Sequence, residues 1–377
     1  RATGAYCAVQ CKFYLPEHTI AKEDIDSFFT AAGKDPFASC IIVSTTDKWS
    51  KNAEDALGQT KPVVRIGLHD LRASPVDWSK FDPKRTSTLG VVAKKEVRPH
   101  QEAAIRDVLK GFKESDRGKL IMACGTGKTF TALRLAEKVT ADVRGGGHVL
   151  FLVPSLSLMS QSLREWTMEA KRPIHALAVC SDANIGKRTT KGAGGEDDRA
   201  DIAVWDLAFP ATTSAKQIVA QYEAIQKRAK KDKESDRMTV VFSTYQSIDA
   251  VSKAQKAGLP DFDLVICDEA HRTTGVSLSK EDESHFVKVH DAKFIRAAKR
   301  LYMTATPRLY GDEAKSKAKE ADALLCSMDD PALYGPEFHR LGFGEAVGKN
   351  LLSDYKVLVL AVDEKYISGA FQKQIAD

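Results

Sequence analysis

The sequence predicts an α/β fold built from parallel sheets with helices on both faces, divided among more than one domain. Short apolar runs alternate with helical patterns along most of the 377 residues, which is typical of strand-then-helix units. This length exceeds one ordinary domain and suits about two or three. The stretch 79–95 is polar, contains Pro83 and shows little apolar periodicity, so we expect a linker there.

The first unit is expected to be a small α/β domain. Strand-like runs occur at 6–13, 41–44 and 63–68, and helical patterns at 20–32 and 52–57. We assign residues 1–83 to this domain and residues 84–97 to the linker.

From Arg98 onward the pattern becomes that of a larger parallel sheet. Apolar strands are expected at 119–123, 148–154, 240–244, 264–268 and 300–304, with helices between them. We assign residues 98–312 to this domain, 313–355 to a connector, and 356–377, which opens with an apolar strand, to the start of a further domain. Two polar stretches, 181–201 and 227–237, are interpreted as solvated excursions.

Composition indicates a soluble globular protein. The net charge of +5 permits a nucleic-acid partner without arguing for one. No apolar run approaches the roughly 18 to 20 residues that span a bilayer, and the first ten residues lack the pattern of a secretory signal. Of the seven cysteines only Cys7 and Cys11 lie close together in sequence, so reduced thiols are expected. We therefore expect a cytoplasmic protein with no membrane partner.

The strongest motif is a Gly-rich turn between a strand and a helix, Gly125-Thr126-Gly127-Lys128-Thr129. Glycines let backbone N–H groups approach phosphates, and the helix N-terminus adds a favourable dipole. We expect Lys128 to contact the β and γ phosphates of ATP and Thr129 to bind Mg²⁺. The strict motif has Gly where this chain has Met122, so the match is to the shorter form found in motor ATPases. The alternative is a chance Gly-rich turn.

A second motif, Asp268-Glu269-Ala270-His271, directly follows the apolar run 264–267. Carboxylates at the end of a buried strand are costly unless a cation lies nearby. We expect Asp268 to bind Mg²⁺ and Glu269 to orient and deprotonate the attacking water. Alone the motif could be an exposed acidic loop, but together with the phosphate loop it indicates an ATP hydrolase.

In this order the two motifs resemble those of the first RecA-like domain of DEAH-box, superfamily-2 helicases and translocases. The resemblance covers roughly Arg98 to Arg308. It implies that Gln101 pairs with adenine, and that His271, Thr304 and Thr306 couple hydrolysis to movement. It also implies that two further motifs grip the sugar-phosphate backbone of DNA, through Pro154, Ser155, Gln161, Ser243, Thr244, Tyr245 and Gln246. In the family a second RecA-like domain supplies a catalytic arginine, so this chain alone should bind ATP but hydrolyse it feebly.

The N-terminal unit places Gln10 and Lys12 two residues apart, on the same face of one strand. With the run 41–46, Trp49 and Asp77-Trp78, this strand resembles the Mrr-like branch of the PD-(D/E)xK nucleases. The resemblance implies that Gln10 completes a Mg²⁺ shell and that Lys12 stabilises the nucleophile and the charge on the phosphate. No Asp precedes Gln10, so we expect the family's metal-binding Asp upstream of Arg1. The alternative is a strand whose Gln10 and Lys12 merely face solvent.

A nuclease joined to such a motor, followed by the stretch 333–357, resembles the type ISP single-polypeptide restriction-modification enzymes. The resemblance implies movement along double-stranded DNA driven by ATP and Mg²⁺, coupled to site-specific, Mg²⁺-dependent DNA cleavage. It also implies methyltransferase and target-recognition domains downstream on the same polypeptide. Two alternatives stay open: the motor subunit of a type I or type III restriction system, and a general superfamily-2 DNA helicase or ATPase switch.

Overall fold

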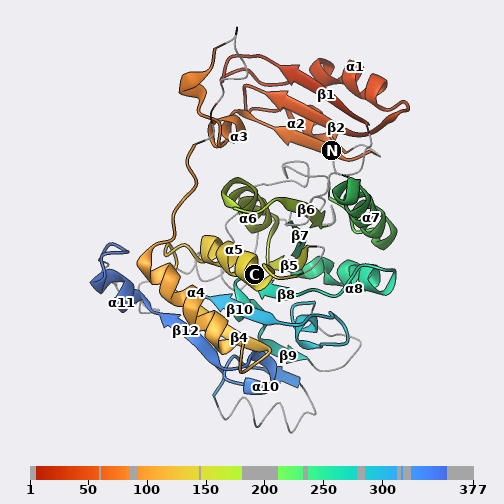
Figure 1. The fold of residues 1–377 in the computed structure, drawn as a ribbon. Coiled ribbons are helices and arrows are strands. Elements are labelled where there is room, and N and C mark those ends of the chain that lie inside the picture. Colours follow the sequence, from red (N-terminus) through yellow and green to blue (C-terminus); the bar gives the residue numbers. More distant parts are fainter. Residues whose placement is uncertain are drawn as a thin grey trace, which may run out of the picture.

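The structure is a computed structural model that describes residues 6–58, 61–82, 84, 90, 92–143, 146–180, 211–231, 237–277, 285–311, 316 and 324–354. A small N-terminal unit lies beside a larger unit that holds most of the chain (Figure 1). The strand expected at the start of 356–377 and the polar stretch 181–201 lie outside the described residues. Within the described part of the chain, no helix combines the length and apolar character needed to cross a membrane.

The N-terminal unit is a three-stranded parallel sheet in the order β1-β2-β3. Its elements are β1 (Tyr6–Lys12), α1 (Glu23–Ala32), β2 (Phe37–Ser44), α2 (Lys51–Asp55), β3 (Val63–Ile66), α3 (Leu68–Arg72) and the 3₁₀ turn η1 (Trp78–Lys80). Ile25 and Phe28 of α1 pack with Ile42 of β2 in one buried cluster. The expected strands and helices of this unit are confirmed.

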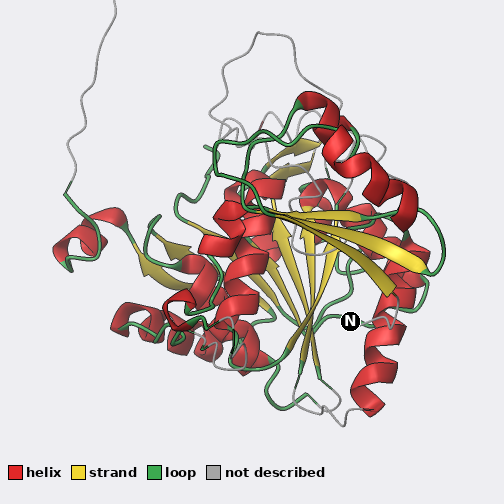
Figure 2. Ribbon diagram, turned by 90° about the horizontal axis from the view of Figure 1, so that it is seen from above, coloured by secondary structure: helices red, strands yellow, loops and turns green. Residues whose placement is uncertain are grey.

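The larger unit contains a seven-stranded sheet in the order β12-β4-β10-β8-β5-β7-β6, and each neighbouring pair is parallel. Its strands are β4 (Arg117–Met122), β5 (Gly147–Val153), β6 (Ile174–Val179), β7 (Met238–Thr244), β8 (Leu264–Cys267), β10 (Arg300–Thr304) and β12 (Glu337–Leu341). Helices cover both faces of the twisted sheet (Figure 2). The α/β parallel-sheet prediction is confirmed.

The helices beside this sheet are α4 (Pro99–Gly111), α5 (Lys128–Val139), α6 (Leu156–Glu169), α7 (Ala215–Lys231) and α8 (Ile248–Lys256). Shorter elements are η5 (Tyr245–Ser247), η6 (Ala270–Thr273), η7 (Lys288–His290), α10 (Pro331–Tyr334), α11 (Phe343–Gly348) and an antiparallel pair, β9 (Gly275–Ser277) with β11 (Leu324–Cys326).

Two sequence interpretations need correction here, and one strand, β6, was not predicted. Residues 227–231, interpreted as part of a solvated excursion, form the last turns of α7. The segment 313–355, interpreted as a connector, contributes β12 to the edge of the large sheet, where Leu341 pairs with Met122 of β4. The sheet therefore extends past the boundary expected at residue 312.

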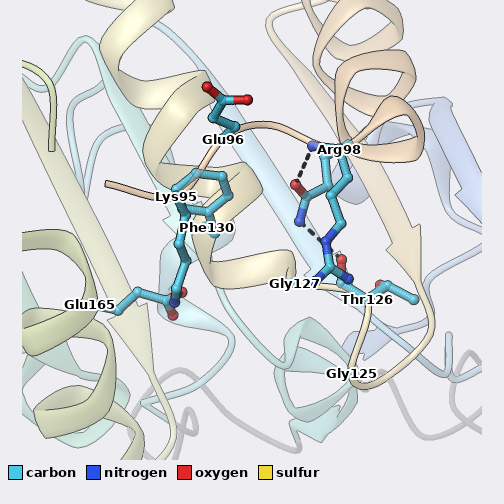
Figure 3. Close-up of a pocket in the computed structure, with 9 residues that line it drawn as sticks. Lys95, Glu96, Arg98, Gly125, Thr126, Gly127, Phe130 and Glu165 are labelled. Carbon is cyan, nitrogen blue, oxygen red and sulfur yellow. Dashed lines mark hydrogen bonds and ion pairs between the residues drawn. The ribbon is translucent and has the colours of Figure 1, made fainter. Parts of the chain in front are cut away.

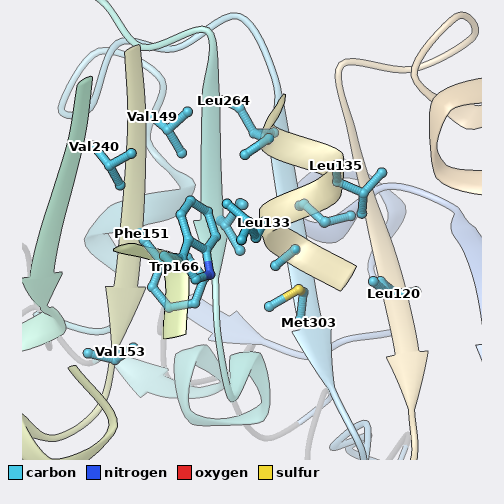
Figure 4. Close-up of a cluster of buried hydrophobic side chains, with 14 of the residues drawn as sticks. Leu120, Leu133, Leu135, Val149, Phe151, Val153, Trp166, Val240, Leu264 and Met303 are labelled. Carbon is cyan, nitrogen blue, oxygen red and sulfur yellow. The ribbon is translucent and has the colours of Figure 1, made fainter. Parts of the chain in front are cut away.

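Two buried clusters cover the two faces of the large sheet. Phe151 and Leu152 are consecutive in β5 and point to opposite faces, so they belong to different clusters. Leu133 of α5 and Trp166 of α6 pack against the Phe151 face (Figure 4). Strands that are buried on both faces need continuous apolar runs, which is why they could be predicted. These packed layers fix the carboxyl ends of the strands, where the site residues lie.

Candidate active site

The motifs expected to act on ATP follow three neighbouring strands. The phosphate loop begins after β4, Thr304 ends β10, and Asp268 follows β8. These strands lie in the order β4-β10-β8 and run parallel, so their carboxyl ends share one edge of the sheet. In open parallel sheets this edge is where ligands bind.

The phosphate loop depends on its glycines. Gly125 and Gly127 have φ angles of 80° and 85°, which side-chain-bearing residues rarely adopt. A Cβ at Gly127 would also lie 2.4 Å from Nε2 of Gln101. Thr126 closes the turn, because its hydroxyl donates to the carbonyl of Ala123 at 2.7 Å. The loop thus has a fixed shape with its backbone free of side-chain bulk.

Gln101 braces this loop from the first turn of α4. Its Oε1 accepts the N–H of Arg98 at 3.0 Å, and its Nε2 donates to the carbonyl of Thr126 at 3.2 Å. Nε2 of His100 lies 2.9 Å from the same carbonyl. An amide has two N–H donors and two lone pairs on oxygen, so one of each is left beyond these two bonds. The expected contact of Gln101 with adenine stays a prediction.

A pocket of about 350 Å³ lies beside the loop (Figure 3). The expected residues Gln101 and Gly125 to Gly127 line it, together with residues that the sequence analysis did not single out: Lys95, Glu96, Arg98, Phe130 and Glu165. Lys95 and Phe130 lie across the pocket from Arg98. These residues come from separate segments, and no spacing in the sequence indicates that they meet.

Asp268 is a buried carboxylate, with 4% of its surface exposed. Burial, and then the charge of Glu269, raise the pKa of Asp268 to about 7, while the charge of Lys128 opposes this rise. A buried carboxyl group of this kind gains stability when a cation replaces its proton. Oxygen donors from Asp268 and the Thr129 hydroxyl, completed by phosphates and water, are the ligands that Mg²⁺ prefers. The residues present therefore fit Mg²⁺.

Glu269 occupies a strained position. Its φ and ψ are 46° and 48°, in the left-handed region that non-glycine residues rarely adopt. The N–H of Glu269 donates to Oδ1 of Asp268 at 3.0 Å, which helps to hold the turn. The side chain of Glu269 stays partly exposed at 23%. The backbone thus places a carboxylate next to the buried Asp268 while leaving it open to water.

His271 connects this turn to the next strand. Its Nδ1 lies 3.0 Å from Oγ1 of Thr304 and 3.4 Å from Oε2 of Glu269. Burial lowers the pKa of His271, which favours the neutral imidazole. Thr306 takes part through its backbone, because its N–H donates to Oγ1 of Thr304 at 3.1 Å. The structure brings the three expected coupling residues together.

A buried polar network supports the turn from behind. The hydroxyl of Tyr334 donates to the carbonyl of Thr273 at 2.8 Å, and Nε2 of His290 lies 3.2 Å from the same oxygen. The hydroxyl of Thr273 in turn donates to the carbonyl of Ala270 at 2.7 Å. The hydroxyl of Tyr302 lies 3.0 Å from Nδ1 of His290. No local sequence pattern marks these residues, which come from separate segments of the chain.

Four of the seven residues expected to contact DNA are buried: Pro154, Ser243, Thr244 and Tyr245. Thr244 of β7 pairs with Val153 of β5, and Nε2 of Gln246 donates to the carbonyl of Pro154 at 3.3 Å. The side chain of Tyr245 is fully buried, and its hydroxyl donates to the carbonyl of Asp268 at 2.9 Å. The side chain of Tyr245 thus points inward, and its expected DNA contact stays a prediction.

Internal hydrogen bonds also occupy the neighbouring hydroxyls. The buried hydroxyl of Ser243 donates to the carbonyl of Thr244, and the hydroxyl of Thr244 bonds to that of Ser247. The hydroxyl of Ser155 caps α6 by accepting the N–H of Leu158. Gln161 and Gln246 are exposed residues, so the DNA contacts predicted for these two residues are compatible with their positions.

In the N-terminal unit, Gln10 and Lys12 share a face of β1 with the buried Ala8. Oε1 of Gln10 is buried without a hydrogen-bond partner among the described residues, so Gln10 does not merely face solvent. The pKa of Asp24 is lowered, mainly by the N–H of Ala21, and the charge of Lys12 contributes to that lowering. The described residues contain no cluster of three or more His, Cys, Asp and Glu side chains that could hold a metal. An unpaired amide oxygen beside a lysine is nevertheless an oxygen that a Mg²⁺ shell could use.

Comparisons with known proteins match one family to the N-terminal unit and a second family to the larger unit. Residues 1–88 match a restriction endonuclease family of the Mrr type. Residues 94–309 match the family described as type III restriction enzyme, res subunit. The probable helicase A859L of African swine fever virus (isolate Pig/Kenya/KEN-50/1950) is 26% identical over 71% of this chain and 24% of its own length.

Among solved structures, the ATP-dependent type ISP restriction-modification enzyme LlaBIII bound to DNA is 42% identical. It covers all of this chain and 23% of its own, with a TM-score of 0.79. A nuclease-deletion mutant of the type ISP enzyme LlaGI, in complex with a DNA substrate mimic, is 39% identical over 68% of this chain and 21% of its own, with a TM-score of 0.51. The chain thus spans about a quarter of the length of these relatives.

Proposed function

Since this chain belongs to the family of type III restriction enzyme res subunits and joins an Mrr-type nuclease unit to a helicase-like unit as type ISP enzymes do, we propose that it is the nuclease and first motor part of an ATP-driven restriction enzyme. In this proposal the motor moves along double-stranded DNA and the nuclease cuts it, with ATP and Mg²⁺ as cofactors. One observation supports the motor most strongly. The phosphate loop, the Asp268-Glu269 pair and the His271–Thr304 contact lie at the ends of three neighbouring strands.

The residues of the motor site divide the work of hydrolysis. The loop around Gly125 and Gly127 binds phosphates through its backbone, and Lys128 neutralises their negative charge. When bound, Mg²⁺ would be held by Asp268 and Thr129 and would withdraw charge from the phosphates. Glu269, strained and open to water, orients the attacking water and accepts its proton.

His271 links the hydrolytic carboxylate of Glu269 to the end of strand β10. Because His271 lies against both Glu269 and Thr304, a change at the carboxylate alters a hydrogen bond to β10. Thr304 also receives the N–H of Thr306, so the strand end and the chain beyond it respond together. We assign this relay as the coupling between ATP hydrolysis and movement.

In the nuclease unit, Gln10 would supply an oxygen ligand to Mg²⁺ and Lys12 a cation beside the scissile phosphate. The family's metal-binding Asp, and the methyltransferase and target-recognition domains, would come from other parts of the polypeptide. LlaBIII is bound to DNA and the LlaGI mutant to a DNA substrate mimic, which supports DNA as the track.

The test compares double-stranded DNA, single-stranded DNA and RNA as activators of the complete polypeptide, with and without Mg²⁺. ATP hydrolysis that rises with double-stranded DNA, together with cleavage that requires ATP, is the expected result. Stimulation by RNA or single strands alone, without cleavage, would instead assign the chain to the general superfamily-2 helicases.

A further inference from the structure

The peptide group between Asp268 and Glu269 makes two hydrogen bonds. Its carbonyl oxygen accepts the hydroxyl of Tyr245 at 2.9 Å. Its N–H donates to Oδ1 of Asp268 at 3.0 Å. A peptide group is planar, so the two bonds together fix the plane from which φ of Glu269 is measured. The backbone that carries the hydrolytic carboxylate therefore depends on what holds this peptide.

The observed orientation of this peptide is strained at Glu269. With φ at 46° and ψ at 48°, Glu269 lies in the left-handed region, and such strain persists only where surrounding groups over-determine it. Turning the peptide over would reverse the directions of its carbonyl and N–H and let φ return to a negative value. This strain is similar in size to the net contribution of one or two hydrogen bonds. A single hydrogen bond can thus decide which orientation is populated.

Tyr245 reaches this peptide from a strand that is not a neighbour of β8, because β5 lies between β8 and β7 (Figure 1). Tyr245 follows the end of β7 and shares a buried cluster with Leu152 of β5 and Cys267 of β8. Its ring stacks on that of Phe286, with centroids 5.0 Å apart and ring planes inclined by 30°. This packing directs the hydroxyl past the end of β5 to the turn that follows β8.

Two consecutive residues of the turn after β7 face in different directions. Gln246 is exposed, and its Nε2 donates to the carbonyl of Pro154, whereas Tyr245 is fully buried. Phenylalanine could fill an apolar position of this shape without a hydroxyl that needs a partner. What the hydroxyl of Tyr245 adds to apolar packing is a donor for the Asp268–Glu269 peptide.

We propose that Tyr245 is a positioning residue for ATP hydrolysis, whose hydroxyl keeps the Asp268–Glu269 peptide in the orientation from which Glu269 meets the attacking water. This inference rests on the proposed function and deepens it, because it adds to the hydrolytic turn a residue from outside the run 268–271. Tyr245 acts through the peptide and contacts no part of ATP. Loss of its hydroxyl should therefore slow the chemical step and leave ATP binding by the phosphate loop intact.

The experiment compares ATP hydrolysis by the complete polypeptide and its Tyr245→Phe variant, with Mg²⁺ and saturating double-stranded DNA. The phenyl ring keeps the packing against Phe286, so thermal unfolding should hardly change. We expect kcat to fall by roughly three- to tenfold, the effect of losing one hydrogen bond, with KM for ATP unchanged. Tyr222→Phe is the matched control and should keep the normal rate. Tyr222 packs against the same buried cluster, but its hydroxyl lies 2.9 Å from Nε2 of His148, at the amino end of β5.

A double-mutant cycle with Glu269→Gln distinguishes positioning of the carboxylate from a purely structural role. If Tyr245 acts through Glu269, Tyr245→Phe should change the remaining rate of the Glu269→Gln protein by less than about twofold. A structural role would lower the rate by the same factor in both backgrounds.

The outcomes separate this inference from the proposed function. Absence of ATP hydrolysis by the unaltered polypeptide with every nucleic acid would overturn the proposed function, and this inference with it. Normal hydrolysis by the unaltered polypeptide with an unchanged kcat in Tyr245→Phe would overturn this inference alone. Equal losses in both backgrounds of the cycle, or a rise in KM without a fall in kcat, would also contradict it.

Discussion

The two units of this chain use the same architecture, parallel strands with chemistry at one edge or face, but they differ in how complete that chemistry is. In the motor unit, Asp268, Lys128 and Thr304 lie at or just beyond the ends of neighbouring strands that are buried on both faces. In the N-terminal unit, Tyr6 and Val9 of β1 are 62% and 55% exposed. The buried oxygen of Gln10 in the same strand lacks a partner among the described residues.

This difference explains why the motor site supports a reaction mechanism, whereas the N-terminal unit supports only separate roles for Gln10 and Lys12. A seven-stranded sheet with helices on both faces holds strand ends rigidly, so strained or buried groups such as Glu269 and Asp268 can be kept in place. The three-stranded sheet presents Gln10 and Lys12 but shows no cluster of metal ligands in its described residues. The motor should thus tolerate loss of the nuclease residues, whereas cleavage should not tolerate loss of the motor.

The largest expected effect comes from Glu269→Gln in the complete polypeptide. Removing the base should lower the rate of ATP hydrolysis on the order of 100-fold or more, while ATP binding persists. Cleavage that needs ATP should disappear as well. Hydrolysis assays and nucleotide titration check this result, and Glu102→Gln, an exposed residue in the first turn of α4, serves as the control. Hydrolysis at the normal rate would remove Glu269 from the mechanism.

Lys12→Ala tests the proposed nuclease role of the N-terminal unit. It should lower DNA cleavage on the order of 100-fold, because the charge beside the scissile phosphate is lost, and leave DNA-stimulated ATP hydrolysis unchanged. Lys22→Ala, just before α1, is the matched control with cleavage retained. Unchanged cutting by Lys12→Ala would end the nuclease assignment of this strand.

Core truncations should separate the units by stability. Leu133→Ala removes a fully buried side chain from the motor core and should lower the free energy of unfolding of that unit by about 3 kcal/mol. Ile42→Ala removes a fully buried side chain from the small sheet and should unfold that unit locally, with ATP affinity retained. Hydrogen exchange followed by mass spectrometry locates the destabilised segments. Simultaneous loss of both units in either variant would show that they fold as one.

His290 gives the motor a pH dependence. Burial lowers its pKa to about 4, below the value of about 6.5 in an unfolded chain. Between these pH values the unfolded state binds one more proton, so stability is complete above about pH 6.5 and falls as the pH drops towards 4. The slope is about 1.4 kcal/mol per pH unit from this residue. Urea unfolding from pH 7 to 5 should show a slope that is smaller by this amount in His290→Gln, and equal slopes would contradict the assignment.

The smallest effect is expected at the contact between the units. Asp70→Asn removes the charge that faces Arg164 of α6. A partly exposed ion pair contributes at most about 1 kcal/mol, so the thermal stability of the motor should hardly change. Limited proteolysis of the linker should become faster. A large loss of motor stability would contradict the expectation that the two units are stabilised almost independently.

Those strands could be predicted from the sequence in which the residues of a single segment carry a clear apolar pattern. Strands β4, β7, β8 and β10 each contain an apolar run because both faces of the sheet are buried. Strand β12, Glu-Phe-His-Arg-Leu, is polar because it lies at the sheet edge, and no periodicity marked it. Local signals therefore found the interior of the sheet and missed its border.

The candidate active site shows the same difference between residues that a local sequence pattern marks and residues that it does not mark. The phosphate loop and the Asp268-Glu269 turn could be predicted, because their spacing and position after strands are local properties. Lys95 and Glu165 meet only through the docking of the linker on α6, and Tyr334 reaches Thr273 from a distant segment. Tyr245 was expected to contact DNA because the run Ser243-Thr244-Tyr245-Gln246 resembles a DNA-contacting motif. Its place at the end of a strand buried on both faces turns its ring inward instead.

The most direct test of the central claim is ATP-dependent cleavage by the complete polypeptide on matched double-stranded DNA, single-stranded DNA and RNA. The account predicts cutting of double-stranded DNA that requires both ATP and Mg²⁺ and is lost in Glu269→Gln and in Lys12→Ala. The same two variants should differ in DNA-stimulated ATP hydrolysis, which only Glu269→Gln abolishes. Cleavage that proceeds without ATP, or hydrolysis that responds only to RNA or single strands, would contradict the coupling of this motor to this nuclease.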